Sequence, residues 1–102
     1  MLNAQSLEPE TARKLLEKAI GINGRIAAAH FELGVVLDRT RNYPEAAREF
    51  ESAAELEPGD AATHYRLSRI YDRLGNTDAA RKEREIHARL IAAEQAAGEL
   101  RR

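Results

Sequence analysis

The sequence contains no cysteine and no tryptophan, and it has only three prolines and five aromatic residues, two Phe and three Tyr, in 102 positions. Without cysteine the chain cannot form a disulfide scaffold, a thiolate metal site or a thiol nucleophile. Its apolar runs end after three or four residues, too few to cross a bilayer. The N-terminus lacks the basic-then-apolar layout of a signal peptide, so we expect a cytoplasmic protein that does not contact membranes.

Neither sign of charge dominates, because the sequence has 16 basic and 17 acidic residues. The balance is uneven along the chain: residues 1–60 carry 7 basic and 11 acidic groups, and residues 61–102 carry 9 and 6. Such a polarity can orient a charged partner. The basic residues of the second part are interrupted by acidic ones such as Asp72 and Glu83, and RNA readers need exposed aromatics for stacking, so nucleic acid is not the expected partner.

Alanine is abundant, with 19 residues, and the chain repeats itself with a period of 34 residues. The period superimposes several sets of positions. These are Ala12, Ala46 and Ala80; Glu17, Glu51 and Glu85; His30 and His64; and Leu33 and Leu67. Apolar spacing and the Pro and Gly residues divide the periods into five predicted helices, over about 9–21, 25–40, 44–56, 61–74 and 78–98.

The repeated residues resemble the tetratricopeptide repeat family, whose signature combines Leu-Gly, a second helix written Ala-x-x-x-Phe, and a Pro at the exit. The segment 27–60 carries this pattern, and the next segment carries its first helix but places Arg84 and His87 where the family has Phe and a small residue. The matching positions are Leu33, Gly34, Leu37, Ala46, Phe50, Ala53 and Pro58 in one segment, and Leu67, Ser68, Tyr71, Leu74 and Gly75 in the next.

The resemblance implies an all-α superhelix of about two and a half helix-turn-helix repeats in a single domain, 1–102. Its parts would be a half repeat at 8–26, a full repeat at 27–60, a divergent last repeat at 61–94 with a long terminal helix, and a tail at 95–102. The chain would then be the C-terminal part of a longer array. Phe50 is predicted to lie in the core, where small residues such as Ala46 let helices approach closely.

No residue pattern indicates catalysis, a cofactor or a metal site. His30 and His64 fall one repeat apart, but zinc needs three or four convergent ligands, so packing in the core or at a groove edge is the expected role of both. The serines have no Gly-x-Ser-x-Gly context and no evident base partner. We therefore expect a protein that is not an enzyme.

The resemblance also implies a concave groove lined by the first helix of each repeat, in which a partner peptide or helix would lie. The candidate groove residues are Phe31, Glu32, Val35, Arg39, Tyr65, Arg66, Arg69 and Arg73. The arginines favour an acidic or mixed apolar-acidic protein partner. The alternative is that the aromatic residues are partly buried and the charges only solvate a face. The Lys and Asn clamp with which some members hold a terminal carboxylate is not reproduced, because Phe31 and Val35 stand in its place.

A second candidate function is structural, as a scaffold or self-association segment. The helix at 9–21 lacks a preceding partner helix, so its apolar residues Leu15, Leu16 and Ile20 could join protomers, unless Met1–Leu7 folds back as a cap. The last helix, with Ile86, Leu90 and Ile91, is expected to cap the array, with assembly as its alternative role.

Overall fold

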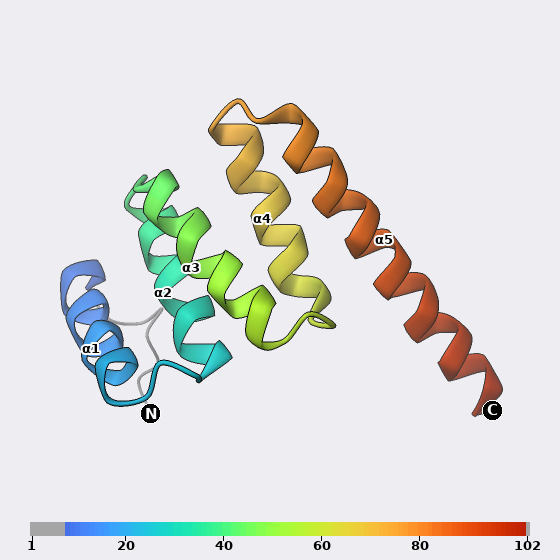
Figure 1. Ribbon diagram of the computed structural model, residues 1–102, viewed down its shortest axis with the longest axis horizontal. Coiled ribbons are helices and arrows are strands. Elements are labelled where there is room, and N and C mark those ends of the chain that lie inside the picture. Colours follow the sequence, from blue (N-terminus) through green and yellow to red (C-terminus); the bar gives the residue numbers. More distant parts are fainter. Residues whose placement is uncertain (1–7, 102) are drawn as a thin grey trace.

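The computed structural model describes residues 8–101 and shows five helices joined by short loops (Figure 1). They are α1 (Pro9–Ile22), α2 (Ala27–Arg39), α3 (Tyr43–Leu56), α4 (Ala61–Arg73) and α5 (Thr77–Leu100). The predicted all-α superhelix is confirmed, and the predicted helix bounds differ from the observed ones by two residues at most.

Local chemistry explains where the helices begin. Pro44 lies in the first turn of α3, where its missing N–H costs nothing. The side chains of Asp60 and Asn76 cap α4 and α5, accepting hydrogen bonds from Ala62 N at 3.1 Å and Ala79 N at 3.2 Å. The N-cap of α5 is therefore Asn76, two residues before the predicted start of this helix, and Asp78 lies in the first turn.

The ends of α2 and α4 share one geometry, 34 residues apart. Arg41 and Gly75 both adopt the left-handed conformation, with φ of 63° and 80°. In each case the next residue's N–H closes the turn, Asn42 N to Leu37 O and Asn76 N to Tyr71 O, both at 2.8 Å. These are the paired bonds that commonly terminate helices.

Each helix packs on the next in chain order, so the core runs through the centre of the stack. Its largest fully buried side chains are Val36 of α2, Phe50 of α3 and three residues of α4, which are Thr63, Leu67 and Ile70. Small residues mark the closest approaches, since Ala46 and Ala80 have no exposed surface. The predicted burial of Phe50 is confirmed.

The two ends of the stack are less well covered. α1 buries only Ala12, and Leu15 is 54% exposed. α5 buries only Ala80, and its C-terminal half extends beyond α4 (Figure 1). The predicted cap by Met1–Leu7 lies outside the described residues. Within residues 8–101, no helix is both long and apolar enough to cross a membrane.

Candidate protein-interaction surface

Three arginines of α4 form a row in which each guanidinium lies over an aromatic ring. Arg66 lies 5.9 Å from the ring centre of Phe31, Arg69 lies 6.0 Å from that of Tyr65, and Arg73 lies 5.6 Å from that of Tyr43. We call Arg66, Arg69 and Arg73 the arginine row. Their spacing of three and four residues places them on one face of the helix.

The rings orient the guanidinium groups without neutralising them. Arg73 also donates a hydrogen bond to the Tyr43 hydroxyl at 3.0 Å. Within residues 8–101 none of the three arginines forms a salt bridge, whereas Arg84 of α5 is paired with Asp72 at 3.0 Å. The arginine row therefore presents three stacked cations that have no acidic partner in the described part of the chain.

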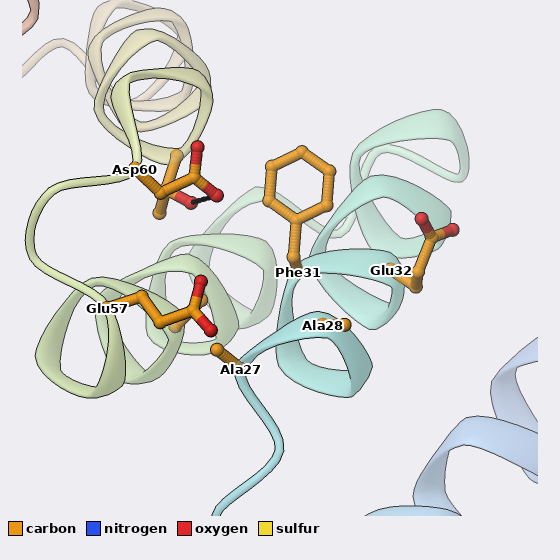
Figure 2. Close-up of a pocket in the computed structure, with 8 residues that line it drawn as sticks. Ala27, Ala28, Phe31, Glu32, Glu57 and Asp60 are labelled. Atoms are coloured by element: carbon orange, nitrogen blue, oxygen red, sulfur yellow. Dashed lines mark hydrogen bonds between the residues drawn. The ribbon is translucent and has the colours of Figure 1, made fainter.

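A pocket of about 140 Å³ lies beside this row, where the start of α2, the end of α3 and the start of α4 meet. We call it the Phe31 pocket. Figure 2 shows the Phe31 ring with Glu57 and Asp60 to one side and Glu32 to the other. Its lining is completed by the small or short side chains Ala27, Ala28, Ala53 and Thr63.

The carboxylates of the Phe31 pocket differ in whether another group of the chain already binds them. Asp60 accepts hydrogen bonds from Ala62 N and from the Thr63 hydroxyl at 3.3 Å. Glu32 and Glu57 form no ion pair with any cation in residues 8–101. The pocket and the row share Phe31, so an acidic site and a basic site adjoin on one surface.

The structure brings most of the predicted groove residues together. Phe31 and Glu32 line the pocket, and Tyr65 is 46% exposed and lies 5.6 Å from the His87 ring. Arg39 is exposed in the last turn of α2. Val35 is the exception: only 4% of it is exposed and it belongs to the core, so it is not available to a partner.

Sequence reasoning missed three members of this surface, Tyr43, Glu57 and Asp60. Tyr43 and Asp60 were not among the candidate groove residues, and both adjoin a helix start, in the segments Asn42-Tyr43-Pro44 and Pro58-Gly59-Asp60. For Tyr43 and Asp60 the available signal was their place beside the starts of α3 and α4.

The two repeated histidines serve the scaffold and lie in equivalent settings. His30 Nδ1 faces Glu49 Oε1 at 2.8 Å and its Nε2 faces the Gly24 carbonyl at 2.8 Å. His64 has the same arrangement one repeat later, with Glu83 at 2.6 Å and the Pro58 carbonyl at 2.8 Å. Each histidine thus ties a preceding loop to the following helix, as expected for a packing role.

The charge of His30 follows from its two acceptors. Burial disfavours the imidazolium, but the hydrogen bonds to Glu49 and to the Gly24 carbonyl, with the charge of Glu49, outweigh burial and raise the pKa of His30 above 6.5. Within residues 8–101 no three His, Asp or Glu side chains are grouped as a metal site would require.

Comparison with known proteins agrees with this architecture. Residues 39–83 match the family model described as tetratricopeptide repeat. No curated protein matches the chain significantly. Repeats of this family generally mediate protein interaction and are not catalytic.

Solved structures of MamA have a similar fold. One, described as the crystal structure of MamA, is 23% identical with a TM-score of 0.83 and covers 86% of this chain. Those described as MamA AMB-1 and MamA MSR-1 are 26% and 25% identical, both with a TM-score of 0.83, and cover 87% and 89% of this chain. This chain spans only about half of each relative, 52%, 49% and 52% of their lengths. The family match and the shared fold together show that the chain carries a tetratricopeptide repeat within an all-α superhelix.

Proposed function

We propose that this chain is a non-catalytic protein-interaction module that binds a segment of a partner protein across α2 and α4. The observation that carries the proposal is the arginine row, three stacked guanidinium groups without acidic partners in residues 8–101. A guanidinium can bind a carboxylate through two parallel hydrogen bonds. Stacking on a ring limits its rotation, so less conformational entropy is lost on binding.

The surface also offers apolar contact. Tyr65 is 46% exposed and its ring centre lies 6.0 Å from the Arg69 guanidinium. Tyrosine supplies a large contact area with few rotatable bonds. A segment with carboxylates and an apolar side chain would satisfy both features. We assign the helices to a half repeat at 8–26, a full repeat at 27–60 and a divergent repeat at 61–94, and the groove would belong to the latter two.

The test is a charge reversal on the row. We expect Arg66→Glu combined with Arg69→Glu to abolish binding of a fluorescent peptide that contains glutamates and a leucine, measured by anisotropy. Arg48→Glu combined with Arg89→Glu makes the same change of net charge at exposed positions of α3 and α5 outside the row. This control should retain binding, and both proteins should keep the circular dichroism of the native chain. Equal affinity of the two double variants would refute the role of the row.

Self-association is a second candidate function, favoured by the exposed face of α1. Leu15 is 54% exposed and Ile22 is 79% exposed, and their separation of seven residues places them on the same face of the helix. Ile26, in the loop that follows, is 43% exposed. Such a patch marks an interaction site when it is contiguous.

Sedimentation velocity distinguishes this second function from the first. If α1 joins protomers, the native chain should show a concentration-dependent increase in mass above 11.4 kDa. Leu15→Glu should remove that increase without weakening peptide binding at α4. A native chain that stays monomeric at every concentration would exclude the α1 interface.

A further inference from the structure

We propose that the partner segment carries side chains of both charges: an arginine that enters the Phe31 pocket and carboxylates that bind the arginine row. This inference rests on the proposed function and adds the chemistry and direction of the partner. It is carried by the charge order of one continuous surface. Glu57 is the C-cap of α3 and Asp60 is the N-cap of α4, and the arginine row follows along α4.

The pocket has the shape and chemistry for a long cationic side chain. Its floor and wall are Phe31 and alanines, against which the methylene stem of an arginine can pack. Its rim carries Glu32 and Glu57, which form no ion pair in residues 8–101, and Asp60, whose oxygens also cap α4. A guanidinium placed between these carboxylates would supply hydrogen-bond donors to Glu32 and Glu57, whereas Asp60 already accepts two hydrogen bonds.

A partner segment with only acidic charged side chains would be repelled by part of this surface. Any carboxylate of the partner that extends past Arg66 toward Asp60 approaches the three carboxylates of the Phe31 pocket. The resulting repulsion fixes the orientation of the partner segment and excludes wrong partners. A segment with only basic charged side chains would be repelled by the arginine row. A segment with separated charges suits both ends, and it can lie in only one direction.

The helix geometry fixes the spacing in the partner. Asp60 and Arg66 are six residues apart on α4, which corresponds to a rise of about 9 Å. An extended peptide covers this distance with about three residues, at roughly 3.3–3.6 Å each. The partner segment should therefore carry its first carboxylate about three residues from the arginine.

The probe is a labelled peptide with one arginine, then an apolar spacer that places the first glutamate about three residues from the arginine, and then a run of glutamates. Its matched control replaces the arginine by citrulline, which has nearly the same shape and no charge. We expect the citrulline peptide to bind the native chain about fivefold or more weakly, since a charge-assisted contact is lost. Glu32→Gln combined with Glu57→Gln should remove this difference, whereas Glu55→Gln combined with Glu94→Gln should preserve it.

The outcomes separate this inference from the proposed function. If both peptides bind equally to the native chain, and Arg66→Glu with Arg69→Glu abolishes both, the module binds acidic segments and the arginine pocket is wrong. If neither peptide binds the native chain, the proposed function fails as well. Amide shifts of Ala28 and Thr63 that respond to the arginine peptide, and not to the citrulline peptide, would locate the side chain in the pocket.

Discussion

Gly34 of α2 faces the ring of Phe50 on α3 across the core. A methyl group at this position would lie 2.8 Å from Cε1 and 2.9 Å from Cδ1 and Cζ of Phe50, which is closer than carbon atoms can approach. Phe50 is completely buried, so any shift of its ring would disturb the packed core. One repeat later the equivalent residues are Ser68 and Arg84, so the aromatic ring at the Phe50 position is replaced by an arginine side chain where the glycine is replaced by serine.

We predict that Gly34→Ala destabilises the chain by about 1–2 kcal/mol, because overpacking outweighs the higher helix propensity of alanine. Urea denaturation followed by circular dichroism would measure the change. Gly21→Ala is the matched control, since Gly21 lies in α1 with no atom within 4 Å of an added methyl. That substitution should stabilise the chain by about 0.5–1 kcal/mol. The packing explanation fails if both substitutions shift the midpoint in the same direction.

Arg41 occupies a backbone conformation that suits glycine. Its φ of 63° matches the φ of 80° at Gly75, and its side chain is exposed, so no packing is at stake. We predict that Arg41→Gly stabilises the chain by about 0.5–1 kcal/mol, the relief of left-handed strain less the entropy of the unfolded glycine. Gly75→Arg should destabilise it by a similar amount. Thermal melts of the two variants that show shifts of the same sign would contradict this account.

His30 should make stability depend on pH. Its pKa is raised above 6.5 in the folded chain, so its contribution is complete below 6.5 and is lost as the pH rises through the higher folded value. The free energy of unfolding should therefore fall as the pH rises above about 6.5. In urea titrations at a series of pH values, His30→Gln should flatten this part of the profile. A steep fall that persists in His30→Gln would assign it to other groups.

At the scale of the helices, sequence periodicity was informative where a helix has one buried face and uninformative where it has several. All five helices follow from spacing and from Pro44, Pro58 and Gly75. α2 is buried on several sides, at Ala27, at Ala29 and His30, and from Leu33 to Leu37. Its pattern therefore could not show that Val35 faces the core, although Phe31 four residues earlier lines the pocket.

The rest of the candidate site depends on contacts between helices. The three arginines were predicted as groove residues, but the sequence did not indicate the rings beneath them, which come from α2, from the start of α3 and from α4 itself. The Phe31 pocket forms where three segments of the chain meet, and the pattern of residues along the sequence does not predict which segments come together. The recurrence of His30 at His64 was a long-range signal, but both side chains bind a glutamate of the following helix and are not part of the candidate surface.

α5 is a helix of two parts, and we predict that the outer part can be removed. It has 24 residues and α4 has 13, so about 16 Å of α5 extends past the length of its neighbour. Residues 92–96 are exposed, and their alanines favour a helix without tertiary support. Deletion of residues 93–102 should change the free energy of unfolding by less than about 1 kcal/mol. A larger loss, or the loss of an oligomer seen by light scattering, would instead assign the end of α5 to assembly.

Across the whole molecule, burial decreases from the centre to both ends. The largest buried side chains belong to α2, α3 and α4, whereas α1 and α5 bury one alanine each, Ala12 and Ala80. In stacked repeats each unit contacts only its neighbours, so stability is close to a sum of local terms. A terminal helix can then open while the centre stays folded.

Native-state hydrogen exchange would measure this gradient. We predict the slowest amides in the central helices, at residues such as Val36, Phe50 and Leu67, with opening energies close to that of global unfolding. Amides of α1 and of residues 93–100 should exchange by local opening, several kcal/mol below that limit. Phe50→Ala should lower the protection of the centre by about 3–5 kcal/mol and bring it toward that of the ends. Uniform protection from α1 to α5 would mean that the stack unfolds as one cooperative unit, so that a partner bound at α4 would stabilise α1 equally.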